Sequence, residues 1–155
     1  MTIFGKPLSE YIAFAKIFLL LIVIVGVARL ALSLAGVENA TVKWLSISVV
    51  ALVGVVYYAI RVYTSGFGSY KQLYPLVLFQ SLLGEGLVAL AIVLAIFTGT
   101  DNIYTAPEYS GGGDGKNWLH VVAHLVIAAV VLPLVSWGLS SLVMLVTKKV
   151  APRPA

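Results

Sequence analysis

The most conspicuous residue able to do chemistry in this chain is Glu85. It stands between two glycines in the apolar stretch LLGEGLVAL, residues 82–90. A charged side chain at the centre of a bilayer costs about 2.5–3.5 kcal/mol on insertion scales, so it normally has polar partners. Two kinds of site fit: a neutral carboxyl hydrogen-bonded to a neighbouring helix, and a proton or cation site. The sequence leaves both open.

Ser81 and the two flanking glycines are expected to shape the surroundings of Glu85. Ser81 lies one helical turn before Glu85, within reach of a hydrogen bond. Gly84 and Gly86 remove side-chain bulk on either side. They either allow another helix to approach closely or weaken the helix enough to expose backbone carbonyls.

His120 and His124 are four residues apart, which places both imidazoles on one face of a helix. This spacing suits two ligands of one metal ion, but a zinc site needs three or four. A third ligand would come from Glu85 or from the acidic loop before the histidines, which offers Asp101, Glu108 and Asp114. The alternative that we favour is a pair of interfacial histidines bonded to loop carbonyls or water. The sequence identifies no cofactor.

Arg29 is a second charge inside an apolar segment, in its outer half. By helix rise it lies roughly 12 Å from Glu85 in depth, so a direct pair is strained and a link through His124 or water is easier. We slightly prefer an Arg29 that reaches the membrane surface or pairs with an acidic loop side chain. The predicted buried polar cluster, which a transport site would use, is Glu85, Ser81, Arg29 and His124.

Four apolar segments must position these side chains. Crossing the hydrocarbon layer takes about 20 apolar residues. Four segments qualify: residues 8–34, 42–63, 75–97 and 118–146. Pro75 suits a first helical turn, and Pro133 predicts a kink in the fourth segment. Residues 98–117 form a long glycine-rich loop, expected to be a structured lid or a partner contact.

The composition agrees with a membrane protein. Of 155 residues, 61% are hydrophobic and only 10% charged. The predicted fold is an all-α integral membrane protein, one domain over residues 1–155, folded as an antiparallel bundle of four transmembrane helices. The first segment also resembles a signal peptide, but the charges of Glu10 and Arg29 favour a span.

The distribution of lysine and arginine predicts the orientation. Most of these residues lie in the terminal segments and the loop near residue 65, so both termini are predicted to be cytoplasmic. We expect a multi-pass protein of a bacterial inner (plasma) membrane. The net charge of +4 comes without a basic stripe, which argues against nucleic-acid binding. The chain has no cysteine, which excludes disulfides and thiol chemistry.

Function is less determined than fold. The first expectation is a non-catalytic structural or accessory subunit of a membrane complex, or a homo-oligomer, whose partners are lipid and other membrane subunits. One alternative is a small proton- or cation-coupled transporter or channel that uses Glu85. Another is metal, quinone or lipid binding under the outer loop near His120 and His124. No hydrolase, phosphate-binding or HExxH motif supports an enzyme.

Overall fold

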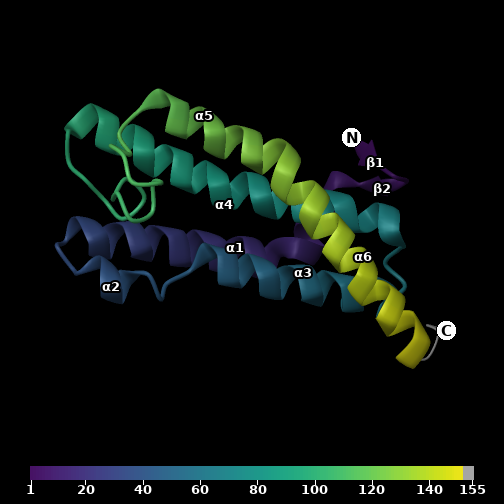
Figure 1. Ribbon diagram of the computed structural model, residues 1–155. Helices are drawn as coiled ribbons and strands as arrows, with labels where there is room; N and C mark the ends of the chain where they lie inside the picture. Colours follow the sequence, from purple (N-terminus) through teal and green to yellow (C-terminus); the bar gives the residue numbers. More distant parts are fainter. Residues whose placement is uncertain (152–155) are drawn as a thin grey trace.

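The computed structural model describes residues 1–151 and is mainly helical (Figure 1). Its helical elements are α1 (Leu8–Leu34), α2 (Asn39–Val42), α3 (Ile47–Thr64), α4 (Tyr70–Thr98), α5 (Trp118–Val126), the π-helical turn η1 (Ile127–Val131) and α6 (Leu132–Val150). Four helical stretches of this described part are long and apolar enough to cross a membrane: Leu8–Leu34, Asn39–Thr64, Tyr70–Thr98 and Trp118–Val150.

Helix α4 is the centre of the bundle. It packs against α1, α3, α5 and α6, while α3 also packs against α6. The start of α1 and the end of α6 lie at the same end of the bundle, and the long loop after α4 lies at the other (Figure 1). Glu85 lies close to the middle of α4 and thus far from both ends.

A short N-terminal hairpin, which the sequence analysis did not predict, precedes α1. Strands β1 (Thr2–Ile3) and β2 (Lys6–Pro7) pair antiparallel, with Thr2 opposite Pro7. The turn between them has positive φ at Phe4 (47°) and Gly5 (82°), a turn geometry that suits two-residue hairpins. Helix α4 holds this hairpin, since the Gln72 side-chain amide donates to Phe4 O at 3.0 Å.

The second and third segments begin differently from the prediction. The second is interrupted, because α2 ends at Val42 and α3 starts after Ser46, whose hydroxyl accepts from Val49 N at 3.3 Å. The third starts at Tyr70 rather than at Pro75. Its start is set by a reciprocal cap between Ser69 and Gln72. The sequence analysis did not foresee this cap, because both residues lie in a polar stretch that resembles a loop.

The fourth segment bends at the predicted place. Asn117 caps α5 by accepting from His120 N at 2.8 Å. Before Pro133 the helix widens into η1, where the N–H of Leu132 donates to Ile127 O. The direction changes between α5 and α6 (Figure 1), because proline has no N–H to continue the regular pattern. The helix then continues to Val150, four residues beyond the predicted end.

Part of the outer loop folds into the bundle. Residues 102–106, here called the loop plug, are all buried. The Asn102 side-chain amide donates to Ala91 O of α4 at 2.9 Å, and the Ile103 N–H donates to Ser33 Oγ of α1 at 2.8 Å. The plug therefore joins α1 to α4 at this end of the molecule, as an ordered closure over the helices.

Candidate functional site

A row of hydrogen bonds connects the middle of α4 to the outer loop. Glu85 Oε2 lies 2.5 Å from His124 Nδ1. His124 Nε2 lies 3.1 Å from His120 Nε2, and His120 Nδ1 lies 2.9 Å from Gly115 O. We call Glu85, His124 and His120 the carboxyl–histidine row. It is a continuous path of polar atoms inside an apolar bundle.

The helices and the loop position this row. Helix α5 places its two histidines four residues apart, so that His120 lies about 6 Å nearer the outer loop than His124. Gly115, whose carbonyl ends the row, is buried against the loop plug. A Cβ at Gly115 would come within 2.6 Å of Thr105 Cα, so only glycine fits there without displacing the plug. The plug therefore fixes the carbonyl that orients His120.

Proton counting fixes the charge of the row. Gly115 O only accepts, so His120 Nδ1 must carry a hydrogen. One proton must lie between the two Nε2 atoms and one between His124 and Glu85, because lone pairs at these distances repel each other. Without these protons the carboxylate and the two imidazolates would carry three negative charges. The three protons balance them, so the row as a whole is neutral. Each of the two shared protons, between Glu85 and His124 and between the two Nε2 atoms, can move from one partner atom to the other while its hydrogen bond stays in place.

The row is largely shielded from its surroundings by protein. The side chains of His124 and Glu85 are 22% and 18% exposed. A hydrogen-bonded path at low dielectric keeps its geometry better than one in bulk water, since few water molecules compete for its donors and acceptors. The arrangement is therefore suited to moving a proton between fixed positions.

Arg29 lies close to the row but is not part of it. Its guanidinium carbon is 5.1 Å from the centre of the Tyr104 ring and 5.8 Å from that of Tyr109, both in the outer loop. No carboxylate of residues 1–151 forms an ion pair with Arg29. The predicted pairing with an acidic loop residue is thus absent from the described chain, and aromatic rings take that place.

Arg29 and Tyr104 each have a buried polar atom without a hydrogen-bond partner in the described part of the chain. Arg29 Nε and the Tyr104 hydroxyl are both buried and have no hydrogen-bond partner among the described residues. Burial raises the pKa of Tyr104 to about 12, while nearby Arg29 opposes this shift and Glu85 adds to it. Unpartnered buried donors are costly, and these two belong to residues that line the same cavity.

Two cavities meet at Glu85. The outer cavity, of about 220 Å³, is lined by Arg29, Ile47, Ser48, Glu85, Val88, Tyr104, Tyr109 and His124. The inner cavity, of about 300 Å³, extends along α3, α4 and α6, and its polar lining includes Ser48, Gln80, Ser81, Glu85 and Ser136. Both share Ile47, Ser48 and Glu85. Glu85 therefore faces an outer and an inner space from one position.

The predicted polar cluster of Glu85, Ser81, Arg29 and His124 is brought together only in part. Glu85, His124 and Arg29 line the outer cavity together. Ser81 is buried and lines the inner cavity with Glu85, but no hydrogen bond joins the two within the described chain. The direct partner of Glu85 is His124 instead.

The acidic loop residues gather elsewhere. Lys116 Nζ lies 2.5 Å from Asp101 and 3.7 Å from Asp114, and the Asn39 side-chain amide donates to Glu108 at 2.9 Å. Together they line a surface hollow of about 410 Å³ that contains neither histidine. The structure therefore does not bring Asp101, Glu108 or Asp114 to His120 and His124.

The distance of these carboxylates from the histidines argues against a metal site at His120 and His124. Within residues 1–151 no group of three or more histidine, cysteine, aspartate or glutamate side chains is arranged to hold a metal ion. The two Nε2 atoms that would bind one ion face each other at hydrogen-bond distance. The geometry supports a hydrogen-bonded row better than a metal site.

Comparison with known proteins gives no guide to this site. No family model, no curated protein and no solved structure matches the chain. Sequence reasoning missed Gly115, Tyr104 and Tyr109 as neighbours of the polar cluster. Gly115 contributes only a backbone carbonyl, and the tyrosines reach Arg29 through a loop fold that no spacing revealed.

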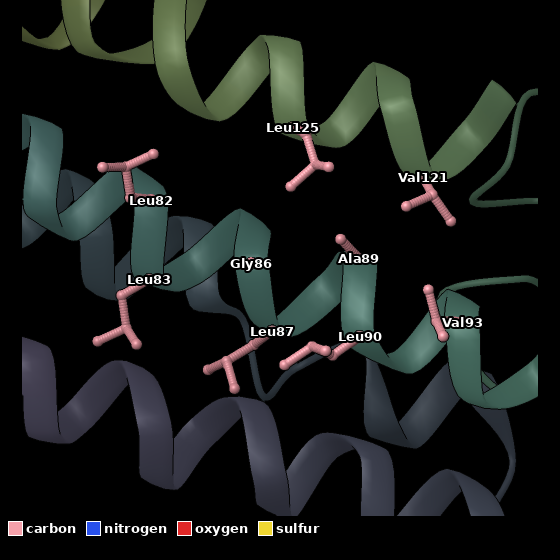
Figure 2. Close-up of a pocket in the computed structure, with 9 residues that line it drawn as sticks. All are labelled: Leu82, Leu83, Gly86, Leu87, Ala89, Leu90, Val93, Val121 and Leu125. Atoms are coloured by element: carbon pink, nitrogen blue, oxygen red, sulfur yellow. The ribbon is translucent and has the colours of Figure 1, made fainter. Parts of the chain in front are cut away.

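The two glycines around Glu85 have different surroundings. A Cβ at Gly84 would lie 3.1 Å from a methyl carbon of Ile47, so Gly84 allows α3 to approach α4 closely. A Cβ at Gly86 would meet no described atom within 4 Å. Gly86 instead lies in an apolar groove between α4 and α5, facing Leu125 (Figure 2). Helix α4 is unbroken at both, so neither glycine exposes backbone carbonyls by unwinding.

Proposed function

We propose that this protein is a small proton-coupled carrier or channel of a membrane, in which Glu85 exchanges protons with the outer surface through His124 and His120. The observation that carries the proposal is the continuous hydrogen-bonded row from Glu85 to the outer loop. Ionisable groups linked in this way within a membrane-spanning segment are typical of proton pathways.

The inner cavity extends the path from Glu85 toward the inner side as far as Gln80 and Leu139. Gln80 Oε1 is buried without a partner, and the cavity lining also includes the hydroxyls of Ser48 and Ser81. The lining of this space of about 300 Å³ is mainly apolar, but its polar groups lie close to Glu85 and would hold ordered water there, since a water molecule needs two to four polar partners. Protons from the outer surface would reach His120 when its hydrogen bond to Gly115 O opens to water, and would then pass through His124 to Glu85 and on to this inner space.

The proposal includes a location and an orientation. We place the four apolar stretches across a bacterial inner membrane, with the loop plug outside and both termini in the cytoplasm. The support is the concentration of lysine and arginine at the end of the bundle that carries the termini. His120 would then face the outer, proton-rich side.

The experiment is proton flux into liposomes that contain the purified protein. A potassium gradient with valinomycin supplies the driving force, and a trapped pH dye reports the flux. Glu85→Gln keeps the shape and removes the exchangeable carboxyl proton, so flux should fall at least about tenfold relative to the wild type. Glu38→Gln, at an exposed glutamate outside the site, is the matched control and should conduct normally.

Equal flux in Glu85→Gln and wild-type protein would contradict the proposal. So would stoichiometric metal in the purified protein that is lost in a His120→Ala/His124→Ala double mutant, because both Nε2 atoms would then bind metal instead of sharing a proton. Helix content and elution volume in detergent show whether each variant is folded.

A second candidate function is the accessory subunit, and the groove at Gly86 favours it. The groove is lined entirely by apolar residues of α4 and α5, as Figure 2 shows. Small residues at such a position let a further transmembrane helix pack closely. Cross-linking from a cysteine introduced at exposed Leu90 would detect a fixed neighbour in the native membrane. Absence of any cross-linked species would remove this candidate.

A further inference from the structure

We infer that the outer cavity binds a small monocarboxylate through Arg29 and Tyr104. The inference deepens the proposed function and rests on it in one respect: the carboxyl–histidine row would supply the proton that accompanies the anion. The binding site itself involves two residues, Arg29 and Tyr104, that are not members of the row.

The charge of the cavity calls for an anion. Arg29 is a permanent cation, and no described carboxylate forms an ion pair with it. Proton counting leaves the carboxyl–histidine row neutral, so the lining of the outer cavity carries one net positive charge. An unpaired charge in a membrane interior is costly, and a ligand with a single negative charge would neutralise it.

The unpartnered donors give the ligand its chemistry. Arg29 Nε–H and the Tyr104 hydroxyl are both buried without a partner and both belong to residues that line this cavity. Tyr104 is only 7% exposed, so water does not readily satisfy its hydroxyl. A guanidinium edge pairs with a planar carboxylate through two parallel hydrogen bonds, which a spherical halide does not offer.

Size and surroundings limit the ligand further. The cavity of about 220 Å³ accommodates a small organic acid, and Ile47 and Val88 give it an apolar wall. A dicarboxylate or a phosphate dianion would bring a second charge that no further cation in the cavity lining neutralises. The neighbouring Glu85, once ionised, would repel the anion, so binding of the carboxylate favours a proton on the row.

The test is saturable binding of radiolabelled benzoate to the purified full-length chain in dodecyl maltoside. Unlabelled benzoate and propionate should compete, whereas neutral benzamide and dianionic succinate should not. Arg29→Gln should weaken binding at least about tenfold, because it removes the one permanent positive charge among the described residues that line this cavity. Tyr104→Phe, which deletes one hydroxyl, should weaken binding about three- to tenfold. Arg61→Gln removes an exposed arginine of α3 and should bind like the wild type.

Several outcomes would overturn the inference: no saturable binding, equal competition by benzamide, or equal losses in Arg29→Gln and Arg61→Gln. If Arg29→Gln does not fold, unchanged binding in Tyr104→Phe overturns it equally. Flux and binding separate the two proposals. Wild-type proton flux without benzoate binding would overturn the ligand site alone. Benzoate binding without any proton flux would overturn the proton path alone.

Discussion

Glu85 Oε2 and His124 Nδ1 lie 2.5 Å apart across the interface of α4 and α5, although 39 residues separate them in the chain. Neither side chain would be stable alone in an apolar bundle, since each requires a partner for its polar atoms. They hold one proton between them, and the whole row of Glu85, His124 and His120 is neutral. This contact joins two isolated polar residues into one hydrogen-bonded unit.

The two histidines should differ in importance. Glutamine at either position keeps hydrogen-bonding ability but cannot accept a proton on one atom and release it from another. We expect His124→Gln to reduce reconstituted proton flux at least about tenfold, like loss of any general acid–base group. His120→Gln should cost less, because His120 lies nearer the outer surface, where water replaces it. Equal flux in both variants and the wild type would show that protons take another route.

Gly115 should be sensitive to a single methyl group. A Cβ there would collide with the backbone of Thr105 in the loop plug, so Gly115→Ala should destabilise the fold by about 1–3 kcal/mol. Gly113→Ala is the control in the same loop, because its Cβ would meet no described atom within 4 Å. Urea unfolding of the solubilised protein compares them. Identical midpoints would mean that the plug does not fix this part of the loop.

The glycines that flank Glu85 form a second matched pair. Leucine at Gly84 would push against Ile47 and separate α3 from α4, with an expected loss of about 1–3 kcal/mol. Leucine at Gly86 would extend into the groove of Figure 2 and relieve the low helix propensity of glycine, worth up to about 1 kcal/mol. Thermal unfolding in detergent should rank Gly86→Leu above Gly84→Leu. The reverse order would contradict the close packing of α3 against α4 at Gly84.

The loop contact between Asp101 and Lys116 should weaken in acid. The hydrogen bond from Lys116 holds the pKa of Asp101 below its ordinary value of 3.8. The folded state therefore gains stability from this carboxylate above about pH 4 and loses it as the pH falls through the lowered pKa. The effect is small because Asp101 is largely exposed.

Melting temperatures between pH 3 and 6 test this contact. Asp101→Asn should flatten that part of the pH profile, whereas Glu38→Gln, at an exposed glutamate outside the contact, should leave it as in the wild type. A wild-type profile unchanged by Asp101→Asn would show that the contact does not form in solution.

Hydrophobicity and length were enough to predict the four long helical stretches. The predicted bounds next to Gly99 and Asn117 were correct to within one residue, and these two residues cap the helices through neighbouring backbone atoms. The break between α2 and α3 and the early start of α4 were not foreseen. Both depend on whether a polar residue caps a helix or continues it, and Ser46 and Ser69 are compatible with either.

For the candidate site, sequence spacing identified the residues but not their connections. The turn-by-turn placement of His120 and His124 was readable, and the depth of Glu85 indicated His124 as a neighbour. The role of Arg29 was not readable, since its ring partners Tyr104 and Tyr109 come from a loop whose path depends on tertiary contacts. Likewise, the sequence could not indicate the Gly115 carbonyl as a partner of His120, because every residue has a backbone carbonyl.

The central claim is that one continuous row of shared protons runs from Glu85 to the Gly115 carbonyl. Nuclear magnetic resonance of the protein labelled with ¹⁵N-histidine tests it most directly. We predict a hydrogen on His120 Nδ1 and a scalar coupling between the Nε2 atoms of His120 and His124, transmitted through the proton that they share. Glu85→Gln should alter the His124 resonances more than those of His120. Two histidines with independent signals and no coupling between their Nε2 atoms would contradict the claim.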